Sequence, residues 1–173
     1  MKVFFCFRSL DKDEGEKIIS DLSESSDNSV AVYKEIEHTD NWKLNVEKKI
    51  KQSDFVIFLL GAETFESKQI MWEYAKAKDL NKRIVGIKLP NASEKSILFC
   101  QGFQVFENAK QCLPYLKDTF EIDRQLRIEQ YKIMVSSTEK VTEQRLKVNN
   151  LFFTLFGIYY GTSYLVEKPM REI

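Results

Sequence analysis

An α/β fold built on a mostly parallel sheet is predicted by the way apolar segments alternate along this chain. Short apolar runs of strand length are separated by segments in which apolar residues recur at helical spacing. The run at residues 54–61 is unbroken in its hydrophobicity, as expected for a strand that helices cover on both faces. From residue 121 the alternation stops and a long helical pattern follows. The sequence therefore predicts a doubly wound α/β domain and a long C-terminal helix.

The first half of the domain contains two predicted strands and the helix between them. Residues 2–7 (KVFFCF) form an apolar run bounded by charge, which predicts a central strand. Residues 11–25 show helical spacing, and Asp11 or Asp13 can cap this helix. Residues 29–35 (SVAVYKE) are β-branched and alternating, which predicts the second strand.

The second half repeats this alternation. A helix over 41–52 leads to the strand at 54–61, and a helix over 67–80 leads to a fourth strand at 83–89, which Pro90 ends. The remaining predicted elements are a short fifth strand at 103–106 and a helix over 108–120 that contains Pro114. Five strands joined in this way most often adopt the flavodoxin-like order, with helices on both faces of the sheet.

Beyond the domain, the composition of the chain changes. Residues 121–147 contain no Gly or Pro and alternate charged with apolar residues, which predicts one long exposed helix. Apolar positions seven residues apart face polar ones there, so a coiled coil is only weakly supported. The predicted parts are the α/β domain at 1–120, a polar connecting helix at 121–147, a candidate transmembrane helix at 148–166 and a short polar tail at 167–173.

The segment at 148–166 is the candidate for membrane insertion. It runs for 19 residues without a charge, close to the roughly 20 apolar residues that a spanning helix needs. Aromatic side chains near both ends resemble interfacial anchors, whereas Asn, Thr, Ser and Gly residues dilute the apolarity. The alternative is a helix docked on the sheet, which is disfavoured because the segment is apolar all around. Arg145 and Lys147 predict that the α/β domain stays on the cytoplasmic side.

Composition and charge exclude several classes of function. The chain carries 26 basic and 26 acidic residues, and a zero net charge argues against general nucleic-acid binding, which needs a basic surface. The three cysteines are far apart and form no C-x-x-C pair, so we expect buried thiols in a reducing cytosol. With one histidine, His38, no metal site is predicted. No signal peptide begins the chain, and it contains no G-x-G-x-x-G, P-loop or Ser/His/Asp combination.

One strand–turn–helix segment, residues 56–73, carries the main candidate for chemistry. An apolar strand ends at Gly61 and leads into a helix on which Glu73 follows Trp72. Open α/β sheets build ligand sites at the carboxyl ends of such strands. At about 100° per residue, Glu73 falls on the flank of the helix's apolar arc, where a carboxylate is partly desolvated and still reaches a cleft. The alternative is a surface glutamate that pairs with a helix neighbour such as Lys76.

Three segments together have the order and spacing of a known family. They are KVFFCFRS at 2–9, KIKQSDFVIFLLGAETFES at 49–67 and IMWEYAKAKDLNKRIVGIKL at 70–89. The shared pattern is an apolar strand ending in a Gly turn, then a Ser, a W-E pair, an Ala one turn later, and a basic turn into another apolar strand. In these features the chain resembles a TIR-like domain, specifically the Thoeris-type branch of bacterial antiphage systems. The resemblance covers residues 2–89 well and 90–120 loosely.

This resemblance implies a reaction. TIR enzymes cleave the nicotinamide–ribose bond of NAD, which is then a substrate and not a cofactor, and Thoeris-type members release cyclised ADP-ribose signals. Glu73 stands at the position of the family's catalytic glutamate, where a carboxylate can stabilise the oxocarbenium-like charge on the ribose. Phe7, Arg8 and Ser9 would line the same cleft, although the family usually has a serine or tyrosine there. Trp72 would either pack against the substrate or belong to the core.

A second resemblance concerns the tail. The stretch YKIMVSSTEKVTEQRLKVNNLFFTL at 131–155 looks like the entry of SLATT-type bacterial membrane effectors, which have two membrane helices where this chain has room for one. The two resemblances imply an antiphage-defence protein anchored to the bacterial inner membrane, self-associating through its TIR-like domain or its long helix. The alternative is a non-enzymatic TIR-like module that senses, or that perturbs the membrane. A receiver-like domain is disfavoured, because Arg8 and Ser9 stand where receivers place acidic residues.

Overall fold

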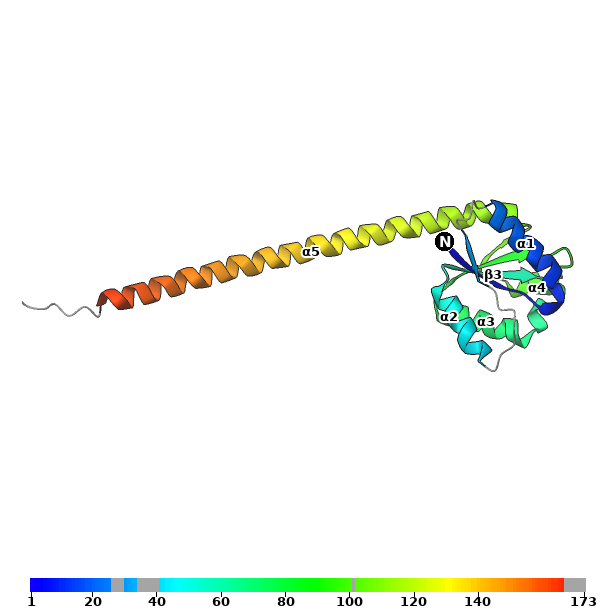
Figure 1. Ribbon diagram of the computed structural model, residues 1–173, viewed down its shortest axis with the longest axis horizontal. Helices are drawn as coiled ribbons and strands as arrows, with labels where there is room; N and C mark the ends of the chain where they lie inside the picture. The colour runs from blue at the N-terminus through cyan, green and yellow to red at the C-terminus, as the bar shows by residue number, and fades with distance from the viewer. Residues whose placement is uncertain (26–29, 34–40, 101, 167–173) are drawn as a thin grey trace, which may run out of the picture. The chain divides into compact units, whose positions relative to one another are not determined.

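A five-stranded parallel sheet forms the centre of the protein. The computed structural model describes residues 1–25, 30–33, 41–100 and 102–166. The strand order is β2-β1-β3-β4-β5, and every neighbouring pair is parallel (Figure 1). The strands are β1 (Lys2–Cys6), β2 (Ala31–Tyr33), β3 (Phe55–Leu60), β4 (Arg83–Lys88) and β5 (Gln104–Phe106). This is the predicted flavodoxin-like arrangement, so the predicted fold class is confirmed.

Helices follow the strands as predicted, with one addition. The elements are α1 (Lys12–Ser25), α2 (Trp42–Gln52), α3 (Lys68–Asp79), α4 (Glu94–Phe99), α5 (Ala109–Val166) and the 3-10 turns η1 (Ser9–Asp11) and η2 (Thr64–Glu66). Helix α4 was not predicted, because six residues are too few to show a helical period. Its start is capped by Ser93, whose Oγ accepts a hydrogen bond from the Ser96 amide at 3.2 Å.

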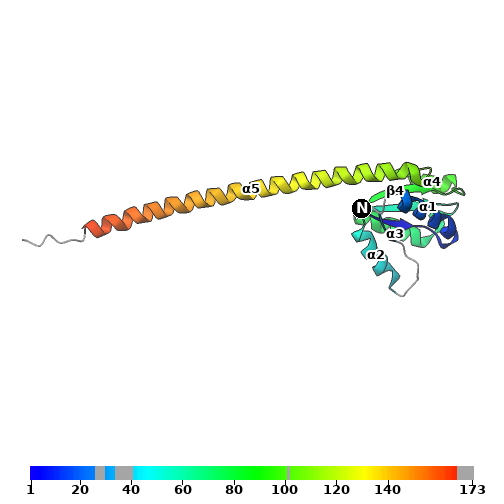
Figure 2. The ribbon, with the colours of Figure 1, turned by 45° about the horizontal axis from the view of Figure 1, so that its top comes forward.

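The side chains of the strands alternate between two apolar layers. Val3 and Phe5 of β1 pack on the side of α1 and the first turns of α5, which we call the α1 face. Phe4 and Cys6 pack on the opposite side, with α2 and α3, which we call the α3 face. Figures 1 and 2 show α1 and the α2–α3 pair on opposite sides of the sheet. All six residues of β3 are buried, as its unbroken hydrophobicity predicts.

Helix α5 is a single element that runs through the predicted connecting helix and the predicted transmembrane segment. None of the helices in the described part of the chain is long and apolar enough to cross a membrane. This finding corrects the expectation of a transmembrane helix at 148–166. The physical reason lies in its composition: Asn149, Asn150 and Thr154, with further hydroxyl and glycine residues, keep an uncharged segment from being sufficiently apolar for a bilayer core.

By its internal contacts the chain divides into two units, Met1–Ile122 and Asp123–Ile173. The first unit contains the sheet, its covering helices and the first turns of α5. In the second unit the large apolar side chains between 126 and 158 that the structure describes are exposed, apart from Val135, which is half-buried.

Candidate functional site

The carboxyl ends of β1 and β3 form the topological switch point of the sheet. From β1 the chain continues to β2 on one side, whereas β3, β4 and β5 lie on the other side. Ligands of open α/β sheets bind in the crevice outside such a point. The residues directly after β1 (7–11) and after β3 (61–66) are therefore where a site is expected.

A network of buried hydrogen bonds fixes the turn after β3. The Gly61 amide donates to Thr64 Oγ1 at 2.8 Å, and this hydroxyl donates to the Leu59 carbonyl at 3.4 Å. Thr64 is fully buried, so these bonds are shielded from water. From the start of α4, Ser93 Oγ donates to the Ala62 carbonyl at 2.6 Å. The turn is therefore a well-defined wall of the switch point.

Glu73 lies on α3 and is almost completely buried, with 3% of its surface exposed. Ser67 caps this helix by accepting a hydrogen bond from the Ile70 amide at 3.3 Å. Gln69, one turn before Glu73, donates its Nε2 to Glu73 Oε1 at 3.4 Å. The helical spacing predicts Glu73 on the flank of the packed face, and the structure sets it deeper, among the buried residues of α3 with Ile70 and Ala77.

The Glu73 carboxylate interacts with Cys6, the last residue of β1. Cys6 is 1% exposed, and its partner in the strand register is Phe58. Burial raises the pKa of the Cys6 thiol well above its ordinary value, and the charge of Glu73 and a hydrogen bond with it raise this pKa further. The thiol therefore stays protonated and donates to the carboxylate. This contact holds Glu73 at the carboxyl end of β1.

Arg8 connects the two strand ends. Its Nη1 forms an ion pair with Glu63 Oε2 at 2.9 Å, which links the segment after β1 to the turn after β3. The Arg8 side chain is 19% exposed and that of Glu63 55%, so solvent weakens this pair, and its main effect is to position the guanidinium. Ser9 begins η1 and is exposed. Arg8 and Ser9 thus both lie at the switch point.

Phe7 lies on the other face of the sheet from Glu73. Its ring packs against Gly15 of α1, where an added Cβ would come within 3.2 Å of both Phe7 and Leu59. The ring belongs to the apolar layer on the α1 face. The structure therefore does not bring Phe7 and Glu73 together.

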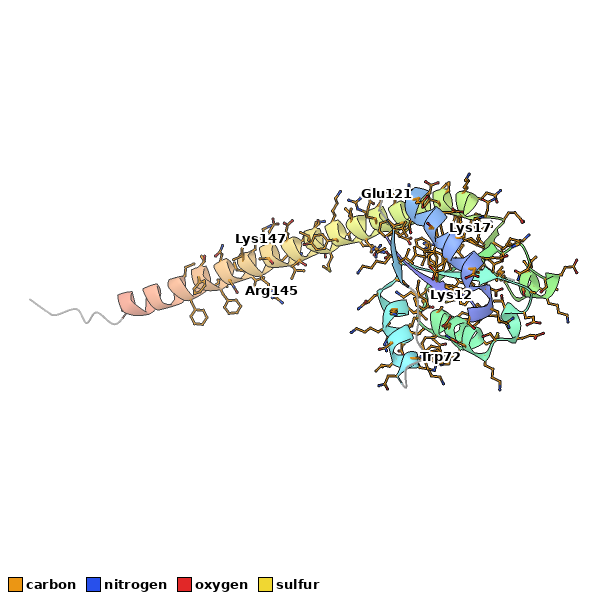
Figure 3. The ribbon with its side chains drawn as sticks, turned by 45° about the vertical axis from the view of Figure 1, so that its right-hand side comes forward. Lys12, Lys17, Trp72, Glu121, Arg145 and Lys147 are labelled. Atoms are coloured by element: carbon orange, nitrogen blue, oxygen red, sulfur yellow. The ribbon has the colours of Figure 1, made fainter. Side chains whose placement is uncertain are left out.

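Trp72 belongs to the contact between α2 and α3. Its ring packs edge-on against Trp42 with centroids 5.1 Å apart and an interplanar angle of 70°. The ammonium groups of Lys43 and Lys76 lie 5.8 and 5.9 Å from its centre. Figure 3 shows Trp72 next to α2. Its side chain thus packs between α2 and α3 and braces α3.

Asp11 is a functional candidate that the sequence analysis treated only as a helix cap. It ends η1 and is 7% exposed. Asn91, after β4, donates its Nδ2 to Asp11 Oδ1 at 3.3 Å. A Cβ at Gly61 would lie 2.7 Å from both carboxylate oxygens, so the glycine is what allows Asp11 to lie over the end of β3. In the sequence, the only signal for Asp11 was an acidic residue shortly after a predicted strand. Residues 11, 61 and 91 are far apart in the chain and lie close together because the strands that precede them are neighbours in the sheet.

The groups at the switch point suit a polar organic ligand. They are carboxylates, a guanidinium, an amide and a protonated thiol, which hydrogen-bond and stabilise charge. Among the residues that the structure describes, no group of three or more His, Cys, Asp or Glu is arranged to hold a metal ion. His38 lies outside the described residues.

A known protein family and two solved structures are similar to this chain. A family sequence model described as TIR domain matches residues 3–111, more than half of the chain. A solved structure of the CMP N-glycosidase BcmB from Clostridium botulinum is 20% identical with a TM-score of 0.46, covering 68% of this chain and 98% of that one. A 2-deoxyribosyltransferase from Bacillus psychrosaccharolyticus is 17% identical with a TM-score of 0.46, covering 65% and 90% respectively. The comparison with curated proteins returned no match.

Proposed function

Because the chain belongs to the TIR domain family, we propose that it cleaves the bond between nicotinamide and ribose in NAD, with Glu73 as the catalytic carboxylate. The observation that carries this proposal is the place of Glu73. It is a buried carboxylate on the helix after β3, hydrogen-bonded to the residue that ends β1 at the switch point. A surface glutamate with a structural role has no need of this burial, because burying a carboxylate is unfavourable.

The reaction follows from the charge on Glu73. As the bond between the anomeric carbon and nicotinamide breaks, its electron pair goes to the ring nitrogen and neutralises the pyridinium. Positive charge then develops on the ribose, where a carboxylate that hydrogen-bonds the ribose hydroxyls stabilises it. Water attacks the anomeric carbon and loses a proton, so the products are nicotinamide, ADP-ribose and a proton.

The residues around Glu73 have different roles in this proposal. Arg8 and Ser9, at the end of β1, lie where they can contact the polar part of NAD. Phe7 and Trp72 support the site from the α1 face and from α2, so their contribution to substrate binding is indirect.

A narrower proposal concerns the biological setting. The three segments that resemble the Thoeris-type branch support a role in antiphage defence. In that setting a nucleophile within the same ADP-ribose unit replaces water and loses its proton, and the product is a cyclised ADP-ribose.

The test is NAD turnover by the full chain and by Glu73→Gln, which removes the charge and keeps the shape of the side chain. We expect the substitution to lower nicotinamide release by about a hundred-fold or more. Mass spectrometry of the products distinguishes linear from cyclised ADP-ribose. A series of protein concentrations is needed, because many TIR enzymes act only when assembled.

Asp79→Asn is the matched control, because Asp79 is an exposed carboxylate at the end of the same helix, α3, outside the segments that follow β1 and β3. It should keep the turnover of the unchanged chain. Equal turnover in Glu73→Gln and Asp79→Asn would remove Glu73 from the mechanism.

A second candidate function is self-association without catalysis. The observation in its favour is the series of exposed apolar side chains along α5, which includes Leu151, Phe152 and Phe153. No NAD turnover at any protein concentration, together with assembly that needs these side chains, would favour this function.

A further inference from the structure

The Asp11 carboxylate is buried with one oxygen that lacks a hydrogen-bond partner. Oδ1 accepts from Asn91, whereas Oδ2 is inaccessible and has no donor within reach among the described residues. Asp11 as a whole is 7% exposed. Glu14, three residues further along, also has a buried oxygen, Oε2, without a donor in the described part of the chain. Two carboxylates on one side of the start of α1 thus share this property.

Such oxygens are unfavourable in a folded protein. Buried polar atoms nearly always have a hydrogen-bond partner, and the cost is larger for a charged group. An acceptor that the protein itself does not satisfy is therefore expected to receive its donor from a bound molecule.

The position of Asp11 complements that of Glu73. Asp11 lies over Gly61, at the end of β3, whereas Glu73 contacts Cys6, at the end of β1. Side chains alternate between the faces along each strand. Leu59 packs on the α1 face, so Gly61 and Asp11 lie on that side of the strand ends, and Cys6 lies on the α3 face. A ligand that crosses the switch point meets Glu73 on one side and Asp11 on the other.

We propose that Asp11, supported by Glu14, forms a second subsite that accepts hydrogen bonds from the substrate on the α1 face of the switch point. The ligand group is a hydroxyl or amino donor of a nucleotide, supplied either by the nicotinamide riboside half or by the adenosine half. Asn91 is a positioning residue, because its amide donates to Oδ1 and thereby orients the carboxylate. This inference rests on the proposed function for the identity of the substrate.

The test is NAD binding by the full chain carrying Glu73→Gln, measured by titration calorimetry so that turnover does not consume the ligand. Adding Asp11→Asn should raise the dissociation constant for NAD roughly 10- to 100-fold, the effect of losing one hydrogen bond to a charged group. Asp13→Asn is the matched control. It also removes a charge from the start of α1, but from an exposed position, so binding should stay within about two-fold.

Separate titrations with AMP and with nicotinamide mononucleotide show which half supplies the donor. Asp11→Asn should weaken the binding of one of them and leave the other unchanged. Equal binding of NAD by the Asp11→Asn and Asp13→Asn chains overturns the subsite.

Unfolding by urea separates this role from a structural one. An amide is less costly to bury than a carboxylate, so Asp11→Asn should be at least as stable as Asp13→Asn. A large loss of stability with unchanged binding would make Asp11 structural and overturn the inference. If Asp11→Asn does not fold, Asn91→Ala replaces it, because Asn91 is exposed and its loss frees Oδ1. NAD binding that is unchanged in Asn91→Ala would then overturn the subsite.

The two proposals fail in different ways. Turnover that persists in Glu73→Gln removes the catalytic role of Glu73, whereas weaker binding of ADP-ribose, which this reaction does not consume, in Asp11→Asn still establishes the subsite. Turnover lost in Glu73→Gln, with binding indifferent to Asp11, leaves the proposed function and removes the subsite.

Discussion

At the scale of single residues, the proposed chemistry depends on two buried acidic side chains, Glu73 and Asp11. Each is held by one neutral donor from another part of the chain, Cys6 in one case and Asn91 in the other. A neutral donor orients a carboxylate without cancelling its charge. The charge therefore stays available for a substrate that is polar or becomes cationic.

The three thiols should be almost inert in the folded chain. Burial raises the pKa of Cys100 and of Cys112 from 9.0 to about 12, and the pKa of Cys6 is also raised. A shift from 9 to 12 reduces the thiolate about a thousand-fold near neutral pH, and the thiolate is the reactive form. We expect no alkylation by iodoacetamide at pH 8 without denaturant and three alkylated cysteines in concentrated urea, measured by mass spectrometry. Alkylation of native Cys6 at the rate of a free thiol would show that the site around Glu73 is open.

The same shifts give stability a pH dependence. A thiol whose pKa is raised in the folded state contributes stability that is complete below its unfolded pKa, near 9, and is lost as pH rises toward 12. The urea midpoint of the folded chain should therefore fall above about pH 9.

At the scale of elements, the turn after β3 and helix α3 act together. Thr64 fixes the turn, and Ser67 starts the helix by capping it. Since Glu73 lies less than two turns after Ser67, the direction of the first turn of α3 determines where the carboxylate points.

Ser67→Ala should weaken both stability and activity. Loss of a helix cap costs about 1 kcal/mol, because the Ile70 amide loses its acceptor. We expect this change in the free energy of unfolding measured in urea, with a fall in NAD turnover. Ser20→Ala is the control, because Ser20 is exposed on α1 and its Oγ donates to the exposed Glu24 at 3.0 Å, so the change should stay within about 0.5 kcal/mol. Equal effects of the two substitutions would contradict the role of the cap.

At the scale of the whole molecule, the two units differ in how they are stabilised. The first unit buries an apolar layer on each face of its sheet. The second is a helix with exposed apolar side chains, and long helices obtain most of their stability from packing against something else. We therefore expect the second unit to pair with further copies of the chain.

The mass of the full chain should rise with concentration, whereas residues 1–122 alone should stay monomeric and folded. Light scattering coupled to gel filtration measures both. Phe153 is 77% exposed, so Phe153→Glu should weaken association by adding a charge to the apolar surface. Gln144→Glu, at an exposed polar position of α5, is the control and should leave association unchanged. A full chain that stays monomeric at all concentrations would contradict this prediction.

Much of the fold was predictable because strands and helices of one α/β domain leave strong periodic patterns. The strands, their order and the full burial of β3 follow from apolar runs and from the short connections between them. Helix α4 was not predicted because it is short. The membrane segment was predicted wrongly because its absence of charge was given more weight than its polar residues. Glu73 was visible as a candidate from its angle on a single helix.

By itself, the sequence determined the class of fold, the family and the helix position of Glu73, because all three depend on residues close together in the chain. Only the tertiary structure decided which side chains meet. It joined Glu73 to Cys6, moved Phe7 to the opposite face and set Asp11 beside Gly61 and Asn91. These contacts depend on how β1, β3 and β4 pair with one another in the sheet. The pairing of strands is set by the burial of apolar side chains that are far apart in the chain, so it cannot be read from a short stretch of sequence.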